Sequence, residues 1–298
     1  QLTLLRRTAP HLPSIALAQV GLGSTTGDLV ASACERHGDR VMVRFEGRRL
    51  TYADMGRAMS RVARWAQEEG LGRGDVVALM MENRPEFLQV WMGLCQAGIT
   101  TALINTKLTG AGLEHALTEA NSACVIVGGE LTGVLEQVVE QGCESGPVWV
   151  LADGPSLRHE VPDAFRSLDG ALADQSGLPV SAKARKGVSP RDPLFYIYTS
   201  GTTGLPKAAK FSHARFLGAG LLALAGGFGR DDTMYCALPL YHTAGGVIGV
   251  SAVMQTGATI ALARRFRASR FFFEATALGA TAIQYIGEIG RASCRERV

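Results

Sequence analysis

From Asp28 onward, apolar residues recur along the chain in segments that alternate between helical and strand spacing. Helices are predicted over 52–69, 85–98, 113–120 and 131–141, and strands over 76–80, 100–104, 124–127, 148–151 and 194–198. Repeated β-α-β units form a mostly parallel sheet with helices on both faces. The pattern therefore predicts an α/β fold with doubly wound, mostly parallel sheets in two subdomains.

Two local signals add detail near the start of this pattern. The segments 41–45 and 48–50 flank Glu46-Gly47, a turn pair typical of a β-hairpin. Thr51 followed by Asp54 is the pattern of a capping box, in which each side chain binds a free backbone N–H at the start of a helix. A hairpin followed at once by a helix is therefore expected.

A polar, proline-containing stretch interrupts the α/β pattern once and has the composition of a surface connection. The predicted organisation is a lead segment (1–26), a first α/β subdomain (27–151), a connection (152–192), a second α/β subdomain (193–289) and a tail (290–298).

Two uncharged stretches, 87–106 and 244–263, are long enough to span a bilayer. Each contains Gln, Thr and internal glycines, and each divides into a helix pattern followed by a strand pattern. We therefore expect a buried helix–strand pair in both places, while peripheral contact with a membrane stays open.

Composition and charge narrow the class of protein. Hydrophobic residues make up 47% and charged residues 19% of the chain, an ordinary globular balance that excludes disorder as the main theme. The net charge is +3 without any Lys/Arg run, so nucleic acid is not an expected partner. The six cysteines show no CxxC spacing and no Cys/His cluster, and residues 1–9 show no secretion signal. We expect reduced thiols, a cytoplasmic protein and no metal site formed by these residues.

The segment with the most distinctive chemistry follows the strand at 194–198 and reads Thr199-Ser-Gly-Thr-Thr-Gly-Leu-Pro-Lys207. Glycines let backbone N–H groups converge on anionic oxygens, hydroxyls add donors, and lysine adds positive charge. The spacing differs from the Walker pattern, and the chain has no GxGxxG. From composition alone, a phosphate-binding loop and an unliganded surface loop are equally well supported.

Longer stretches carry a family resemblance because they match one set of motifs in order. They are Leu50-Thr-Tyr-Ala-Asp54, Gly74-Asp-Val-Val-Ala-Leu79, Asn83-Arg-Pro-Glu86, 196–210, Leu238-Pro-Leu-Tyr-His-Thr-Ala-Gly-Gly246 and Gln284-Tyr-Ile-Gly-Glu288. Together they resemble the adenylate-forming enzymes, the superfamily of acyl-CoA synthetases, luciferases and peptide-synthetase adenylation domains. The combination, which covers 27–289, is most similar to the fatty-acid transport protein or very-long-chain acyl-CoA synthetase branch.

This resemblance implies an acid–thiol ligase that takes ATP, Mg²⁺ and CoA as co-substrates. A carboxylate and ATP would give acyl-AMP and pyrophosphate, and the CoA thiolate would then displace AMP. Positioning and electrostatic stabilisation of crowded negative charge would dominate catalysis. The resemblance implies that the phosphates are contacted by Thr199, Ser200, Gly201, Thr202, Thr203, Gly204 and Lys207. Thr199 is the preferred single residue, and Lys207 adds positive charge.

His242 follows a strand predicted over 235–238 and precedes a glycine-rich segment. Taken alone, such a histidine is more often a hydrogen-bonded structural residue than a catalytic one. The resemblance implies that it approaches the carboxylate and the α-phosphate at the mouth of an acyl tunnel, as a third catalytic candidate. It also implies substrate-binding roles for Tyr241, His242, Tyr285 and Gly287, the glycine leaving room beside the backbone.

Two further features are expected to be structural. His213 resembles a polar residue at the start of a helix. The aromatic run 271–273 cannot lie on one helix face, and core packing is its preferred interpretation.

The resemblance stops after Ile289, which implies that the fold is incomplete at the C-terminus, with a truncated second subdomain (193–289) and a non-native tail (290–298). The remaining residues carry three arginines in the last eight positions and show no apolar periodicity. We interpret 288–298, wholly or partly, as translated sequencing adapter, a hypothesis that sequencing the genomic locus past codon 287 tests. The family's Mg²⁺, ribose and adenine contacts and its C-terminal catalytic lysine would then lie beyond this chain, which would be an inactive fragment.

The leading hypothesis is the N-terminal part of an ATP-dependent fatty acyl-CoA ligase for long or very long chains. Three alternatives stay open: a ligase for another carboxylic acid (short-chain, aryl or bile-type), a non-catalytic fatty-acid uptake or binding protein on the same fold, and an ATP-hydrolysing switch. Pyrophosphate release with a panel of acids separates the leading hypothesis from a ligase for another acid. ATP binding tests the non-catalytic binding protein, and ADP release would indicate the ATP-hydrolysing switch.

Overall fold

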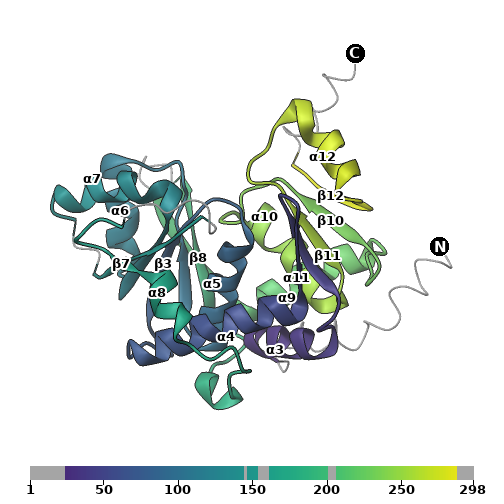
Figure 1. Cartoon of the computed structure of the whole chain (residues 1–298), viewed down its shortest axis with the longest axis horizontal. Helices are drawn as coiled ribbons and strands as arrows, with labels where there is room; N and C mark the ends of the chain where they lie inside the picture. Colours follow the sequence, from purple (N-terminus) through teal and green to yellow (C-terminus); the bar gives the residue numbers. More distant parts are fainter. Residues whose placement is uncertain (1–23, 144–145, 154–160, 201–205, 287–298) are drawn as a thin grey trace.

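Two sheets lie side by side in the computed structural model, with helices between them (Figure 1). The structure describes residues 24–143, 146–153, 161–200 and 206–286, and for Thr199, Ser200 and Pro206 it describes the backbone alone. All structural statements below concern these residues.

The larger sheet has seven strands, and every neighbouring pair is parallel except the last. In spatial order these strands are β7 (Arg166–Ser167), β6 (Val148–Leu151), β5 (Cys124–Gly128), β3 (Val76–Met80), β4 (Thr100–Leu103), β8 (Pro193–Ser200) and β9 (Pro206–Ser212). The central strands are buried along their whole length because helices cover both faces.

The smaller sheet has five strands and is also mostly parallel. Its order is β12 (Ala282–Gln284), β10 (Thr233–Cys236), β11 (Thr259–Leu262), β1 (Val41–Phe45) and β2 (Arg48–Thr51). The antiparallel β1–β2 pair is the hairpin that the sequence predicted, and both of its turn residues, Glu46 and Gly47, have positive φ.

Helices pack on these sheets in three groups. Between the sheets lie α3 (Thr26–Arg36), α4 (Tyr52–Glu68), α5 (Pro85–Gln96), α9 (His213–Ala225) and α11 (Ile248–Thr256). The outer face of the larger sheet carries α6 (Gly110–Ala120) and α7 (Thr132–Glu140), and the outer face of the smaller sheet carries α12 (Phe271–Ala277). Shorter elements are α8 (Leu168–Ala173), α10 (Thr243–Gly246) and the 3₁₀ turns η2 (Gly129–Leu131), η3 (Ala182–Arg185) and η4 (Ala268–Arg270).

Trp91 of α5 joins the larger sheet to α9 at the centre of the core. Its ring is fully buried and makes edge contacts with Phe195 of β8 at 5.2 Å and Phe216 of α9 at 5.7 Å between centroids. Such aromatic pairs contribute ~1 kcal/mol each beyond the burial of their area. The α5 helix is therefore firmly packed between β8 and α9.

The doubly wound α/β class predicted from the sequence is confirmed, and so are the predicted capping box and the two predicted helix–strand pairs. Thr51 and Asp54 form the expected reciprocal capping box at the start of α4. The stretch 87–106 forms α5 and β4, and 244–263 forms α10, α11 and β11. In the part of the chain that is described, no helix is both long and apolar enough to cross a bilayer.

The arrangement of the sheets differs from the linear division that the sequence suggested. Strands β8 and β9, after residue 192, complete the larger sheet, whereas the early β1–β2 hairpin joins the smaller one. The reason is that β1 pairs with β11, so that Val43 lies opposite Ile260. Both sheets therefore take strands from distant parts of the chain, and the subdomain boundaries stay a proposal.

The aromatic run 271–273 also differs from its expected core position. Phe271 is buried beneath the smaller sheet, but Phe272 is 37% and Phe273 is 69% exposed. Successive helix positions differ by about 100° in direction, so α12 can bury only one of the three rings.

Candidate active site

The two described ends of the Thr/Ser/Gly segment lie on paired strands at the edge of the larger sheet. β8 and β9 pair antiparallel, with Thr199 opposite Lys207 and Ser200 opposite Pro206. Lys207 is exposed beside the end of β8. The other predicted phosphate-binding residues, which lie outside the described ranges, are Gly201, Thr202, Thr203 and Gly204.

Tyr241 connects the carboxyl edges of the two sheets. It follows β10, is 6% exposed, and shares a hydrogen bond with the side chain of Thr106, which follows β4. Burial raises the pKa of Tyr241, and the Thr106 hydrogen bond acts in the opposite direction. Leu103 of β4 pairs with Ile197 of β8, so Thr106 and Thr199–Ser200 leave the sheet at the same edge. Tyr241 therefore lies at the edge from which the candidate phosphate loop extends.

His242 lies next to Tyr241 at the start of α10. The two ring centroids are 4.6 Å apart, and the imidazole is half-buried. Burial lowers the pKa of His242, so the ring is neutral at pH 7. A neutral imidazole donates one hydrogen bond and accepts another. It can thus contact a carboxylate or phosphate oxygen through its N–H.

Asn83 holds the segment that carries these two residues. Its Nδ2 donates to the carbonyl oxygens of Leu238 at 2.8 Å and Ala263 at 3.1 Å, and its Oδ1 accepts from the N–H of Leu240 at 2.8 Å. The side chain is 4% exposed, so all these bonds form away from bulk water. A buried amide from the larger sheet therefore fixes the backbone just before Tyr241.

Two glycines allow α10 to pack against that same backbone. A Cβ on Gly245 would lie 2.7 Å from the carbonyl oxygen of Leu238, and one on Gly246 would overlap the carbonyl oxygen of Leu240 and lie 3.4 Å from the Trp91 ring. Their N–H groups donate to the carbonyl of His242 at 3.1 and 2.8 Å. The glycines in this motif are thus explained by close packing that orients His242.

Tyr285 is separated from this pair. It is 61% exposed and lines a cavity of about 390 Å³ between α9, α11 and β12, whose other described walls include Phe228, Met234 and Ile248. Neither Tyr241 nor His242 is part of that lining. Gly287, the remaining predicted substrate contact, lies outside the described residues.

The described acidic, histidine and cysteine side chains do not gather into a group of three or more that could hold a metal ion. His213, expected to be structural, is 3% exposed, and its Nδ1 accepts the N–H of Thr26 at 3.2 Å. This contact ties α9 to the start of α3.

Sequence reasoning missed the supporting residues Asn83 and Thr106. Asn83 was visible inside the Asn83–Glu86 motif, but nothing in the sequence shows which backbone it binds, because its partners lie 155 or more positions away. Thr106 carried no sequence signal beyond following a predicted strand.

Two helix-covered parallel sheets, with a hydroxyl-rich hairpin and a tyrosine–histidine pair at their common edge, define an α/β domain of the adenylate-forming class. The chain belongs to the AMP-binding enzyme family, whose model matches residues 30–293.

Among its relatives, long-chain fatty acid transport protein 6 of Mus musculus is 34% identical over 273 residues, which is 91% of this chain and 43% of that protein. The medium/long-chain-fatty-acid–CoA ligase FadD6 of Mycobacterium tuberculosis is 36% identical over 279 residues, 92% of this chain and 44% of that protein. The chain therefore spans less than half the length of these relatives.

Solved structures support the fold. The inhibitor-bound N-terminal domain of FACL13 from Mycobacterium tuberculosis has a TM-score of 0.78 at 22% identity, over 91% of this chain and 65% of that one. The anthranilate CoA ligase AuaEII in complex with anthranoyl-AMP has a TM-score of 0.77 at 18% identity, over 87% of this chain and 49% of that one.

Proposed function

We propose that this chain is the N-terminal part of an ATP-dependent fatty acyl-CoA ligase for long or very long chains. In the first step a carboxylate oxygen attacks the α-phosphorus of Mg²⁺-bound ATP, and pyrophosphate leaves. In the second step the thiolate of CoA attacks the acyl carbonyl, a thioester forms, and AMP leaves.

One observation carries this proposal: Tyr241 and His242 lie at the edge of the larger sheet from which the Thr199–Lys207 hairpin extends. Both steps develop negative charge on oxygen, which preorganised N–H and O–H donors stabilise best in a partly dry site. The hairpin supplies hydroxyls, backbone amides and Lys207 for the phosphates. The neutral His242 supplies a donor for the carboxylate or α-phosphate.

The acyl chain is assigned to the cavity beside Tyr285. Its described walls include the apolar residues Phe228 after α9, Met234 of β10 and Ile248 of α11, together with the polar side chains of Asp232, Thr281 and Gln284. Burial of apolar chain against such walls stabilises a bound fatty acid by ~0.8 kcal/mol for each CH₂ group. The substrate class follows from this cavity together with the names of the relatives.

The decisive experiment measures pyrophosphate and acyl-CoA formation by the intact gene product with a panel of short, aryl, bile-type and long-chain acids. Release of pyrophosphate and AMP with long-chain acids is the expected result. His242→Ala should lower the rate of acyl-AMP formation about 100-fold, because one donor to the developing charge is lost. ATP affinity and the melting temperature should be nearly unchanged.

Three other results would contradict the proposal. Fatty-acid binding without any ATP consumption would indicate an uptake or binding protein. ADP in place of AMP would indicate an ATP-hydrolysing switch. Activity confined to short or aryl acids would replace the substrate class while leaving the reaction in place.

A further inference from the structure

Two consecutive residues after β3 bind different parts of the molecule. Asn83 binds backbone groups that follow β10 and β11 of the smaller sheet, as described above. Arg84 instead binds the end of β6: its guanidinium donates to the carbonyl oxygens of Leu151 at 2.9 Å and Ala152 at 2.5 Å. The Arg84 side chain is fully buried, and a buried charge is costly unless it is paired and hydrogen-bonded.

Two carboxylates lie beside Arg84. Asp153, which follows β6, lies 3.5 Å from its Nη1, and Glu130 of η2 lies 3.6 Å from its Nη2. Glu130 also accepts the N–H of Glu82 at 2.8 Å. Arg84 therefore joins the segments that follow β3, β5 and β6 within the larger sheet.

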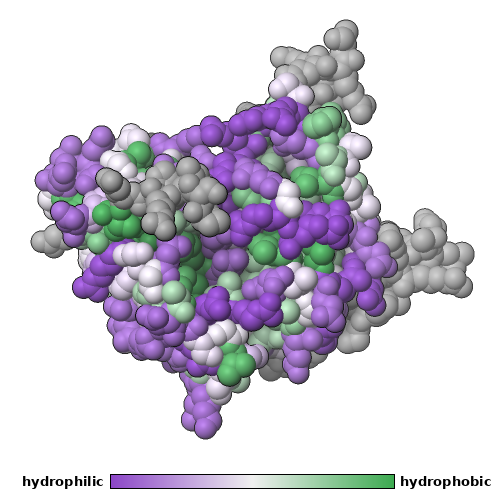
Figure 2. Space-filling view, viewed as in Figure 1, coloured by the Kyte–Doolittle hydropathy of each residue, from purple (hydrophilic) through white to green (hydrophobic). Residues whose placement is uncertain are grey.

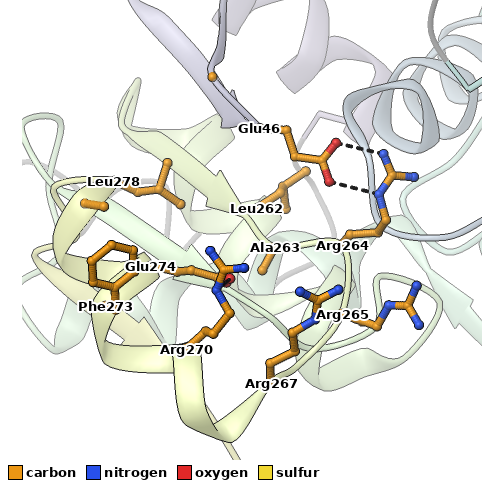
Figure 3. Close-up of a pocket in the computed structure, with 12 residues that line it drawn as sticks. Glu46, Leu262, Ala263, Arg264, Arg265, Arg267, Arg270, Phe273, Glu274 and Leu278 are labelled. Atoms are coloured by element: carbon orange, nitrogen blue, oxygen red, sulfur yellow. Dashed lines mark hydrogen bonds and ion pairs between the residues drawn. The ribbon is translucent and has the colours of Figure 1, made fainter. Parts of the chain in front are cut away.

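Asp153 also pairs with an arginine that belongs to the smaller sheet. Arg264, which follows β11, donates to Asp153 at 2.5 and 3.3 Å and to Glu46 of the β1–β2 turn at 3.0 and 2.9 Å. Figure 3 shows the two bonds between Arg264 and Glu46, and Figure 2 shows strongly hydrophilic surface over the β1–β2 hairpin. The Asp153 side chain is only 12% exposed. The ion pairs thus run from the surface at the hairpin into the interior at Arg84.

We refer to Glu46, Arg264, Asp153, Arg84 and Glu130 as the inter-sheet bridge. Charges alternate along it, so each arginine lies between two carboxylates. The desolvation of buried ion pairs often cancels their attraction, and apolar residues of similar size can give equal stability. What charge-assisted hydrogen bonds add to apolar packing is directional geometry. The bridge is therefore better explained by the arrangement that it fixes than by the stability that it adds.

The bridge adjoins the contacts of Asn83 at both of their ends. Arg264 follows Ala263, whose carbonyl oxygen accepts from Asn83, and Arg84 follows Asn83. His242 follows β10 of the smaller sheet, whereas the segment proposed to bind phosphate leaves β8 of the larger sheet. The distance between these two parts of the candidate site depends on how the carboxyl edges of the sheets are held.

We propose that Asp153 and Arg264 are positioning residues, whose ion pair sets the separation of the two sheet edges and thereby places His242 relative to the phosphate-binding segment. They act through the sheets and not on the reacting atoms. This inference rests on the proposed function, because its main effect is on the rate of acyl-AMP formation. A misplacement of about 1 Å between reacting groups can lower a rate about 100-fold.

The kinetic test measures pyrophosphate release from ATP and a long-chain acid by the intact gene product and its variants. Asp153→Asn and Arg264→Gln should each lower kcat roughly 10- to 100-fold. The KM for ATP should change by less than about twofold, because the phosphate-binding segment keeps its own donors. The double variant should be no slower than the slower single variant, since both substitutions remove the same ion pair.

A conservative variant and a matched control refine this test. Arg264→Lys keeps the charge but lacks the fork that reaches two carboxylates, so it should recover only part of the lost rate. The control is Arg73→Gln, which removes an exposed ion pair with Asp192 at 3.2 Å. Both residues of that pair precede strands of the larger sheet, β3 and β8, at the opposite edge. Its rate should equal that of the unchanged protein.

Hydrogen exchange provides a measurement that does not need activity. In Asp153→Asn and Arg264→Gln, the amides of 238–246 should exchange about tenfold faster, while those of β3 and β4 keep their protection. Arg73→Gln should leave both sets unchanged. Uniformly faster exchange, with a lower melting temperature, would show that the substitutions only destabilise the protein and would overturn the proposal.

Unchanged kcat in both single variants, or losses that add in the double variant, would also overturn it. The two measurements together separate this inference from the proposed function. An active ligase whose rate and exchange ignore the substitutions would refute the positioning role alone. An inactive protein in which faster exchange is confined to 238–246 would support the geometric role of the bridge and refute the ligase alone.

Discussion

At the scale of single residues, Asn83 illustrates how much of the site depends on a side chain that touches no substrate. Its amide makes three hydrogen bonds inside the core. They connect the segment after β3 to the backbone on both sides of Pro239 and to Ala263, which follows β11. A buried polar group of this kind stabilises only while every partner is present.

Replacing Asn83 by Ala should lower the free energy of unfolding by about 3 kcal/mol, because two carbonyl groups and one N–H lose their partner. Asn83→Asp should be no better. It keeps an acceptor for the Leu240 N–H but places a carboxylate opposite two carbonyl oxygens. Urea unfolding of the three proteins measures the difference, and equal midpoints would contradict the role assigned to Asn83.

His213 gives a prediction about acid stability. Burial lowers its pKa from 6.5 to about 4, although Asp192 and Asp28 act in the opposite direction. A group whose pKa is lowered in the folded state contributes stability above its unfolded pKa and loses that contribution as the pH falls. The loss should therefore develop between pH 6.5 and about 4 and reach ~3 kcal/mol.

Urea unfolding at a series of pH values checks this expectation. In His213→Gln, which cannot be protonated, the stability curve should be flatter over that range than in the unchanged protein. Parallel curves for the two proteins would show that other groups cause the acid sensitivity.

At the scale of elements, α10 shows why a short helix can need glycine at consecutive positions. The helix packs so closely on the 238–240 backbone that a methyl group at Gly246 would overlap a carbonyl oxygen. The constraint is one of space, since neither Gly245 nor Gly246 has a positive φ.

We expect Gly246→Ala to destabilise the protein by ~1–3 kcal/mol through overpacking and to move His242 out of position. The matched control is Gly218→Ala in α9, where a Cβ meets nothing within 4 Å. In a helix interior that change should be neutral or stabilise by up to ~1 kcal/mol. Thermal unfolding of both variants tests the difference, and similar effects would mean that space around α10 is not limiting.

The elements that could be predicted from the sequence are those set by short-range chemistry. The capping box at Thr51, the Glu46-Gly47 turn and the separation of 244–263 into helix and strand all follow from residues close together in the chain. The strand predicted at 235–238 is shifted, since β10 is Thr233–Cys236 and matches the length of its neighbour β11. β9 had no strand signal because its segment is polar and partly exposed at a sheet edge.

Long-range pairing explains what the sequence could not provide. No local pattern shows that β1 pairs with β11, that Thr106 meets Tyr241, or that Asn83 reaches Leu240. The candidate site was recognised through motif resemblance. The roles of Thr199, Lys207, Tyr285 and the residues around them stay predictions that the variants above can test.

At the scale of the whole molecule, the chain carries the segment proposed to bind phosphate, the tyrosine–histidine pair and the cavity beside Tyr285, but it spans only 43% and 44% of two ligase and transport relatives. In our proposal the groups that bind ribose, adenine and Mg²⁺ belong to the part not covered. An active site that has only some of its hydrogen-bond donors loses most of its catalytic rate, because positioning and charge stabilisation act together.

The 298-residue chain is therefore expected to produce little or no acyl-CoA, whereas the intact gene product should turn over. A cooperative thermal melt of the shorter protein is the check that it is folded, and chromatography of acyl-CoA is the measurement. A normal turnover rate of the 298-residue chain would show that these residues suffice.

The pairing of β1 with β11 has a consequence for how the protein is made. On a ribosome that adds ~5–20 residues per second, Val43 emerges roughly 10–40 seconds before Ile260 exists to cover it. During that interval the nascent chain presents the mostly apolar β1, whose neighbouring strand β11 has not been synthesised. Biogenesis of this domain should therefore depend on chaperones that shield the early hairpin, and codon changes that slow translation between the two strands should lower its yield.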